Sequence, residues 1–213
     1  MQPTVNLLVP VKPLHRAKTR LLGAADRGAG EPGAHARLVL ALARDTLAAA
    51  AATRTVRRLV AITSDPVVLA VLARDGVPTV PDEPGSGLNP ALRHGERELR
   101  ADDAAAAVGV LPADLPALRP AELDAAVLAA LAGGGRAFCP DRAGTGTTLL
   151  LAAPGHALDP RFGAGSAAAH RAAGASELTG DWPGLRCDVD TGADLAVAHR
   201  LGLGPHTSRV LSN

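Results

Sequence analysis

The sequence predicts an α/β protein of three layers, in which helices cover both faces of a mostly parallel central sheet. Short apolar runs with the length of strands alternate with longer, Ala- and Leu-rich runs of helical periodicity. One apolar run, 104–111, carries no charge, which is typical of a strand buried on both faces. This alternation favours parallel strands joined by helical crossovers. With 213 residues, of which 47% are hydrophobic, we expect a single domain spanning 1–213.

The composition argues against several classes of protein. A net charge of +1 does not favour a nucleic-acid or acidic-membrane partner, and three aromatic residues supply no stacking platform for single strands. No apolar run reaches transmembrane length, and 5–11 is too short for a signal peptide. Cys139 and Cys187 stand in no metal-binding spacing and lie in apolar runs. We interpret both as core thiols and expect a cytoplasmic protein.

The first half of the chain contains three predicted strands and three predicted helices. The strands are 5–11, 58–63 and 77–80, and the helices are 35–52, 67–74 and 91–100. Ser64 or Asp65 is expected to cap the second helix. In the loop before the third helix, the Asn89 amide and backbone N–H groups freed by two glycines suit a base or ribose. A plain linker is the alternative, because Gly-rich loops are common.

A basic loop follows the first strand, with cations at Lys12, Arg16, Lys18 and Arg20. A loop in this position is the usual phosphate site of a Rossmann-like sheet. Of the 22 basic residues only two are lysines, and both lie in this loop. Because an ammonium and a guanidinium are not interchangeable at a phosphate, the bias indicates a site that needs a compact charge. A solvated basic loop is the alternative.

The apolar run 104–111 ends at Asp114, which is held between Pro112 and Pro116. In open α/β sheets ligands bind beyond the carboxyl ends of the strands, so Asp114 is a candidate site residue. The alternative is that Asp114 only shapes the turn or caps the predicted helix 120–132.

The second half of the chain is predicted to contain strands at 136–140, 147–152 and 185–190, and helices at 120–132, 167–173 and 191–201. The loop 141–148 holds two glycines and three threonines, which suit an anionic ligand. Ser166 is expected at the N-cap of the helix 167–173, where an anion can sit on free amides. Capping of its own helix is the alternative role of Ser166.

Asp188 and Asp190 occupy alternate positions of the predicted strand 185–190 and therefore share one face. Two such carboxylates repel each other unless a cation neutralises them, and a divalent cation that prefers oxygen ligands does so. An N-cap role for Asp190 is the alternative, but it leaves Asp188 unexplained.

Five segments together resemble a known family, the phosphoenolpyruvate or 2-phospho-L-lactate guanylyltransferases of coenzyme F-420 biosynthesis. In chain order they are 11–21, 113–118, 144–148, 162–166 and 187–191. The resemblance spans almost the whole chain and implies a Rossmann-like, GT-A-like nucleotidyltransferase fold. The first loop is rich in Lys and Arg, whereas sugar-nucleotide and molybdopterin guanylyltransferases have a Gly-rich loop there, so the resemblance disfavours those activities.

The resemblance also implies roles for individual residues. It implies Thr147, Gly163 and Ser166 as phosphoenolpyruvate contacts, with Thr148 as the alternative to Thr147, and Asp114, Asp188 and Asp190 as magnesium ligands. We expect Lys12, Lys18 and Arg20 to hold the triphosphate of GTP and the leaving pyrophosphate. The expected reaction joins the phosphate of phosphoenolpyruvate to the α-phosphorus of GTP. Because this nucleophile is already ionised, no general base is needed, and we interpret the seven histidines as structural or solvent-exposed.

The sequence leaves other functions open. The acceptor can equally be 2-phospho-L-lactate or 3-phosphoglycerate, since each carries a carboxylate beside a phosphate. A GT-A glycosyltransferase that uses a nucleotide sugar also employs Asp-x-Asp and a metal. A non-catalytic nucleotide-binding regulator on the same fold is a third hypothesis.

Overall fold

The computed structural model describes residues 3–14, 17–26, 28–83 and 85–212, so Arg16 of the basic loop lies outside the described residues. Within these ranges, seven strands form one sheet in the order β3-β2-β1-β4-β6-β5-β7. The strands are β1 Val5–Pro10, β2 Val56–Ile62, β3 Thr79–Val80, β4 Ala107–Val110, β5 Arg136–Pro140, β6 Thr147–Ala152 and β7 Ser176–Glu177. Only β6 runs antiparallel to its neighbours in this sheet. The predicted α/β class with a mostly parallel sheet is confirmed.

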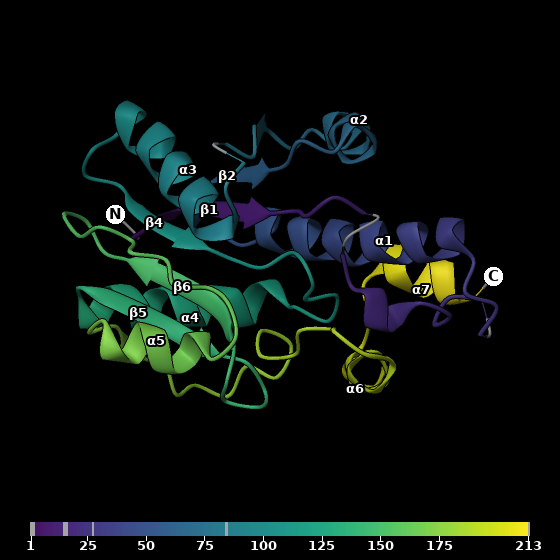
Figure 1. The fold of residues 1–213 in the computed structure, drawn as a ribbon. Coiled ribbons are helices and arrows are strands. Elements are labelled where there is room, and N and C mark those ends of the chain that lie inside the picture. Colours follow the sequence, from purple (N-terminus) through teal and green to yellow (C-terminus); the bar gives the residue numbers. More distant parts are fainter. Residues whose placement is uncertain (1–2, 15–16, 27, 84, 213) are drawn as a thin grey trace.

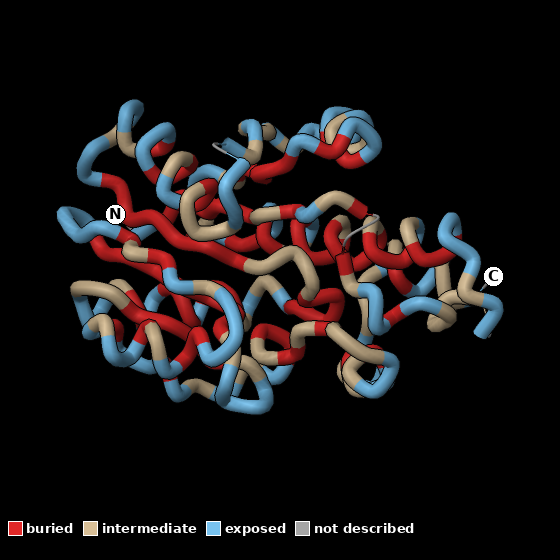
Figure 2. The backbone as a smooth tube through the Cα atoms, in the orientation of Figure 1, coloured by how far each residue is buried: buried red, intermediate tan, exposed pale blue. Residues whose placement is uncertain are grey.

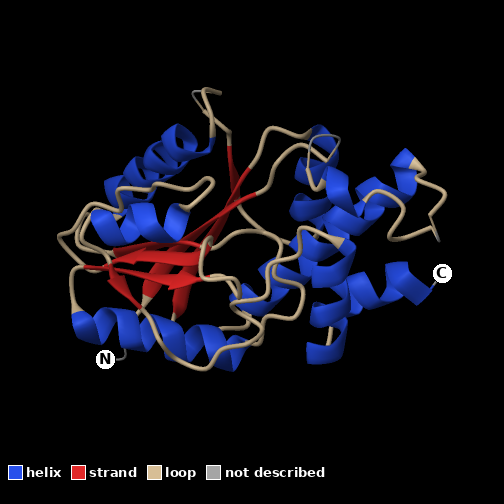
Figure 3. Ribbon diagram, turned by 60° about the horizontal axis from the view of Figure 1, so that its bottom comes forward, coloured by secondary structure: helices blue, strands red, loops and turns tan. Residues whose placement is uncertain are grey.

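Helices cover both faces of this sheet (Figures 1 and 3). They are α1 Pro32–Ala51, α2 Pro66–Arg74, α3 Leu88–Asp102, α4 Pro120–Gly133, α5 Ser166–Ala172, α6 Gly192–Leu201 and α7 Pro205–Ser212, with the short 3-10 helix η1 at Thr19–Leu21. Helices α1, α2 and α4 pack on one face, and α3 and α5 pack on the other. The arrangement is therefore the predicted three-layer α/β/α sandwich.

The core lies on both faces of the strands, which are the buried centre of the molecule in Figure 2. In β1, Leu7 and Val9 contribute to the core under α1, α2 and α4, whereas Leu8 between them contributes to the core under α3 and α5. This follows from the two-residue period of a strand and explains why Leu7, Leu8 and Val9 are apolar in succession. No described helix combines the length and apolar character that crossing a membrane requires.

Three loops meet at one edge of the sheet because of the strand directions. β1 and β4 are parallel, so the segments after Pro10 and after Val110 leave the sheet at the same edge. β6 is antiparallel to β4, with Leu150 opposite Val110, so the loop that precedes Thr147 reaches this edge as well. The basic loop, the Asp114 turn and the Gly-Thr loop are therefore neighbours in space.

The predicted strand 185–190 is wrong. Arg186 N–H donates to Trp182 O and Cys187 N–H to Gly184 O, so the first part of this segment is a turn. Val189 N–H then donates to the carbonyl of Asp114 and so attaches the segment to the turn after β4. Leu185, Cys187 and Val189 are buried, which is the reason for the strand-like alternation. Their backbone groups find partners in loops instead of in the sheet.

Other element boundaries also differ from the predictions. β4 begins at Ala107, later than predicted, since 103–106 form a turn closed by the Ala106 N–H and the Asp103 carbonyl. β7, α7 and η1 were not predicted at all. The expected cap by Asp65 is confirmed, because its side chain accepts the N–H groups of Val67 and Val68 at the start of α2.

One capping prediction, for Ser166, is wrong, and the alternative role of Asp190 as a cap is excluded. The N-cap of α5 is Gly165, with φ 71°, and Ser166 is the first helical residue and makes no side-chain cap. The N-cap of α6 is Thr191, which forms a capping box with Asp194, so Asp190 does not cap that helix. Both Ser166 and Asp190 are thereby left available for the space at the sheet edge.

Candidate functional site

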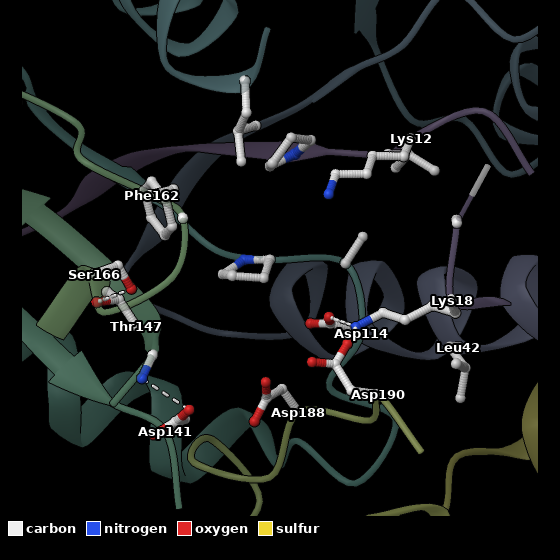
Figure 4. Close-up of a pocket in the computed structure, with 18 of the residues that line it drawn as sticks. Lys12, Lys18, Leu42, Asp114, Asp141, Thr147, Phe162, Ser166, Asp188 and Asp190 are labelled. Carbon is white, nitrogen blue, oxygen red and sulfur yellow. Dashed lines mark hydrogen bonds and ion pairs between the residues drawn. The ribbon is translucent and has the colours of Figure 1, made fainter. Parts of the chain in front are cut away.

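A cavity of about 590 Å³ lies at the edge of the sheet where these loops meet (Figure 4). Its size suits a nucleotide together with a small second substrate. The predicted site residues that line it are Lys12, Lys18, Arg20, Asp114, Thr147, Gly163, Ser166, Asp188 and Asp190. Segments that lie far apart in the chain therefore contribute to one site.

The ammonium of Lys18 lies between two carboxylates. Its Nζ forms ion pairs with Asp114 and with Asp190, and the side chains of Lys18 and Asp114 are only 17% and 18% exposed. Lys18 adopts a left-handed backbone conformation with φ 55°, which directs the chain into η1. Burial opposes the charged ammonium, but the attraction of Asp114 and Asp190 outweighs it and raises the pKa of Lys18. At neutral pH the Lys18 ammonium therefore stays protonated and positively charged.

Asp188 lies beside this triad, and Figure 4 shows its carboxylate on the same side of the cavity as those of Asp114 and Asp190. Burial, together with the negative charges of Asp114 and Asp141, raises the pKa of Asp188 to about 7. One Lys18 ammonium thus faces more negative charge than it neutralises. The negative charge around Asp188 therefore favours the binding of a further cation at this wall.

Asp114, Asp188 and Asp190 form an acidic wall of the cavity, and their carboxylate oxygens are the kind of ligand that a divalent cation prefers. The three side chains do not converge as closely as metal ligands do. Within the described residues no three His, Cys, Asp or Glu side chains converge tightly enough to hold a metal ion. In the same part of the chain, Asp114 Oδ1 is buried and has no hydrogen-bond partner. An orphaned carboxylate oxygen beside Asp188 and Asp190 matches the oxygen ligands that magnesium prefers.

The opposite wall of the cavity presents hydroxyl groups (Figure 4). Thr147, the first residue of β6, lies with its Oγ1 3.0 Å from Ser166 Oγ and 2.9 Å from His170 Nδ1. Thr148 points to the other face of β6, where its hydroxyl donates to the Cys139 carbonyl at 3.4 Å. Thr148 does not line the cavity, so of the two threonines Thr147 is the one in position to contact a ligand.

Asn89 does not line the cavity but forms hydrogen bonds to the backbone of Phe162, which does. Its Nδ2 donates to the Phe162 carbonyl at 2.9 Å, and the Phe162 N–H donates back to its Oδ1 at 2.8 Å. In this structure Asn89 forms a paired hydrogen bond to the loop that precedes α5, and its expected contact with a base or ribose stays a prediction. Gly163, the next residue of that loop, has φ 144°, a conformation that side chains disfavour.

Three further residues at or behind the cavity, Asp141, His170 and Phe162, are not among the predicted site residues. Asp141 accepts the N–H groups of Thr145 and Gly146, each at 2.8 Å, and so shapes the loop before β6. A turn-forming Asp ahead of a Gly-Thr-Gly run was the available signal. For His170 the signal was its distance of four residues from Ser166, which places both on one face of a helix.

The cysteines play no part in the cavity. Cys139 and Cys187 are both buried and reduced, as predicted for core thiols. Burial raises the pKa of each thiol, so neither is an activated nucleophile.

The fold and the cavity define an NTP transferase. The MobA-like NTP transferase domain matches residues 33–186. Among solved structures, a chain assigned as a nucleotide-diphospho-sugar transferase from Desulfovibrio desulfuricans G20 superposes with a TM-score of 0.70 at 20% identity, covering 99% of this chain and 94% of that one. A nucleotidyl transferase from Methanothermobacter has a TM-score of 0.59 at 15% identity, with 94% and 98% covered. These likenesses show the fold.

Curated relatives define the family more narrowly. The Geodermatophilus obscurus protein named phosphoenolpyruvate guanylyltransferase is 53% identical over 206 residues, which cover 97% of this chain and 93% of that protein. The protein of the same name from Streptomyces coelicolor is 53% identical over 206 residues, with 96% and 94% covered. The chain belongs to the phosphoenolpyruvate guanylyltransferase family.

Proposed function

We propose that this chain transfers GMP from GTP to the phosphate of phosphoenolpyruvate and releases pyrophosphate. A phosphate oxygen of phosphoenolpyruvate forms a bond to the α-phosphorus of GTP, and the bond from this phosphorus to the bridging oxygen of the β-phosphate breaks. The product is enolpyruvoyl-2-diphospho-5'-guanosine. The observation that carries this proposal is a single cavity with cationic and carboxylate side chains on one wall and paired hydroxyls on the other.

The basic residues of the first loop account for the nucleotide. Lys12 and Arg20 are exposed to solvent at the cavity, and the Lys12 side chain extends into it in Figure 4. In the proposal they bind the β- and γ-phosphates, which leave as pyrophosphate, while Lys18 supplies a charge beside the α-phosphate. Fixed positive charges stabilise the negative charge that develops on the leaving group.

Asp114, Asp188 and Asp190 would hold magnesium. The orphaned Asp114 oxygen and the surplus of negative charge around Asp188 support this assignment. When bound, the ion would neutralise phosphate charge and polarise the α-phosphorus. The contribution of the three carboxylates is to present oxygen ligands on one wall, opposite the hydroxyls of the acceptor wall.

Thr147, Gly163 and Ser166 form the proposed acceptor wall. The two hydroxyls can donate to a carboxylate or phosphate, and the absence of a side chain at Gly163 leaves its backbone accessible beside them. The acceptor phosphate arrives ionised, so the reaction needs alignment more than proton transfer. In keeping with this, burial lowers the pKa of the nearby His170 to about 4, which leaves it neutral under ordinary conditions.

The same proposal includes a place in coenzyme F-420 biosynthesis and action in the cytoplasm, without a nucleic-acid or membrane partner. The near-neutral net charge supports the expectation that the protein binds neither nucleic acid nor an acidic membrane.

Pyrophosphate release tests the proposal. The full chain is incubated with magnesium, each of the four NTPs and each of phosphoenolpyruvate, 2-phospho-L-lactate and 3-phosphoglycerate. We expect release to depend on GTP and phosphoenolpyruvate together. Asp114→Asn should abolish it, whereas Asp181→Asn, at an exposed aspartate outside the cavity, should behave as the unaltered protein does. Release that requires a different acceptor would replace the substrate assignment, and no release with any pair would reject the activity.

A further inference from the structure

A buried chain of hydrogen bonds connects a backbone amide to the acceptor wall. The Arg161 N–H donates to His170 Nε2 at 3.0 Å, His170 Nδ1 lies 2.9 Å from Thr147 Oγ1, and that oxygen lies 3.0 Å from Ser166 Oγ. His170 is 1% exposed and Ser166 is 3% exposed. Thr147 and Ser166 line the cavity, whereas His170 lies behind them.

The hydrogen bond from the Arg161 N–H determines which nitrogen of the His170 imidazole carries the proton. A backbone N–H is only a donor, so His170 Nε2 must carry a lone pair and no proton. A neutral imidazole then has its proton on Nδ1, and Nδ1–H donates to Thr147 Oγ1. The geometry therefore selects one tautomer out of two.

The tautomer decides how many hydroxyl hydrogens remain for a ligand. Thr147 and Ser166 carry two hydroxyl hydrogens, and the bond between them uses one. When Thr147 accepts from His170, the second hydrogen is free to point into the cavity. With the opposite tautomer, Thr147 would donate to His170 and Ser166 to Thr147, and both hydrogens would be consumed. The wall would then present oxygen lone pairs and repel an anion.

We propose that His170 is a positioning residue, which fixes the donor polarity of the Thr147 and Ser166 hydroxyls and thereby makes this wall selective for an anionic group of the acceptor. The proposed function supplies the identity of the acceptor, a carboxylate beside a phosphate. The tautomer itself follows from the hydrogen bonds alone.

The surroundings of His170 hold the ring in this state. Phe162 packs edge-on against it, with ring centroids 5.2 Å apart, and the Phe138 ring centroid lies 5.9 Å away, so two aromatic rings pack against the imidazole. Burial lowers the pKa of His170 to about 4, with Arg161 and Arg136 acting in the same direction and Asp159 opposing them. A proton on Nε2 would also face the Arg161 N–H.

Nitrogen-15 NMR of the imidazoles in the full chain tests the tautomer directly. The His170 signals are identified as those missing from His170→Asn. We expect a protonated Nδ1 and an unprotonated Nε2 at neutral pH, and we expect the Nδ1 signal to shift when inorganic phosphate is added. A protonated Nε2, averaging between the tautomers, or an Nδ1 signal that phosphate leaves unchanged would overturn the proposal.

Two substitutions separate positioning from packing. The amide nitrogen of Asn can replace Nδ1 and donate to Thr147, whereas Gln reaches only the position of Nε2. We expect His170→Gln to raise KM for phosphoenolpyruvate roughly ten- to a hundredfold with little change in KM for GTP, the loss typical of a hydrogen bond to a charged group. His170→Asn should recover most of it. The control His199→Asn, at an exposed position of α6, should change neither.

The outcomes distinguish this inference from the proposed function. Equal losses in both His170 variants, or equal effects on KM for GTP and for phosphoenolpyruvate, would reduce His170 to a packing residue and overturn the inference. A protein that does not turn over phosphoenolpyruvate at all would reject the proposed function instead. In that case the NMR tautomer and the phosphate titration still decide the inference.

Discussion

Lys18 forms an ion pair with Asp114 across 96 positions of the chain, and both side chains are largely buried. The pair joins the loop after β1 to the turn after β4 at the edge where the cavity opens. Lys18 therefore connects the two loops and also contributes a positive charge to the site. Its removal should therefore affect both nucleotide use and the local arrangement of the acidic wall.

Lys18→Ala should weaken GTP use more than phosphoenolpyruvate use. Losing a charged partner typically costs about 1.5 to 3 kcal/mol, so we expect KM for GTP to rise roughly ten- to a hundredfold. Lys18→Arg should restore only part of this, because a planar guanidinium does not fit the space of an ammonium between Asp114 and Asp190. Separate titrations of both substrates measure the effect, with Arg74→Ala, at an exposed residue of α2, as control. Full recovery with arginine would mean that only the charge matters.

Asp188→Asn should abolish magnesium-dependent turnover and leave the fold intact. The substitution removes a negative charge and almost no volume from a site with surplus negative charge. Its midpoint of thermal unfolding should accordingly not fall below that of the unaltered protein. Magnesium titrations of activity and thermal denaturation, run in parallel, measure the two effects. Turnover near the normal rate in this variant would remove Asp188 from the proposed metal site.

Ser166→Ala should lower kcat/KM for phosphoenolpyruvate by roughly ten- to a hundredfold, with GTP binding nearly unchanged. The Ser166 hydroxyl does not cap α5 and is paired with Thr147 at the cavity, so its loss affects the acceptor wall and not the helix end. Steady-state kinetics with each substrate varied in turn checks this. Equal losses for both substrates, or a large drop in unfolding temperature, would indicate a structural role instead.

Asn89→Ala should raise KM for phosphoenolpyruvate, although Asn89 does not line the cavity. Its two hydrogen bonds to Phe162 hold the loop that contains Gly163, and their loss leaves this loop free to shift. Asn89→Asp keeps an acceptor for the Phe162 N–H and should be less harmful. Comparison of both variants in acceptor titrations decides between loop positioning and base recognition. A larger effect on KM for GTP would favour recognition of the base.

Acid should destabilise the protein through His170. Its pKa is about 4 in the folded protein and near 6.5 when unfolded, so between these values the unfolded chain binds more protons. The free energy of unfolding therefore falls as pH drops from about 6.5 to 4, by an amount on the order of 3 kcal/mol for this one group. Denaturation at several pH values measures the slope. His170→Asn, which cannot titrate, should show a shallower slope, and an identical slope would contradict the assignment.

The strands that build the sheet were predictable because their burial is a local pattern. Predominantly apolar runs such as Val5–Pro10 and Thr147–Ala152 are strands, with Leu7 and Leu8 in cores on opposite faces. The segment 185–190 also has a strand-like pattern, an alternation in which Leu185, Cys187 and Val189 are buried. Its backbone partners, however, are Trp182, Gly184 and Asp114, and local periodicity carries no information about such pairing.

The residues that line the cavity were easier to predict from the sequence than the ion pairs and hydrogen bonds among them. Residues after strand ends gather at one edge because the strand directions require it, and this brings Lys18 and Asp114 into one cavity. Asp190 follows no strand and reaches the cavity because the Val189 N–H donates to the Asp114 carbonyl. The ion pairs among them depend on side-chain positions that no sequence pattern contains. The choice between Thr147 and Thr148 depended on the register of β6, where a shift of one residue exchanges the two faces.

Phosphorus-31 NMR of the products tests the central claim most directly. The full chain is incubated with magnesium, GTP and phosphoenolpyruvate, and the spectrum is followed as the substrates are consumed. The account predicts equimolar pyrophosphate and a new diphosphate that joins guanosine to enolpyruvate. Formation of GDP with inorganic phosphate, or no consumption of phosphoenolpyruvate while pyrophosphate appears, would contradict it.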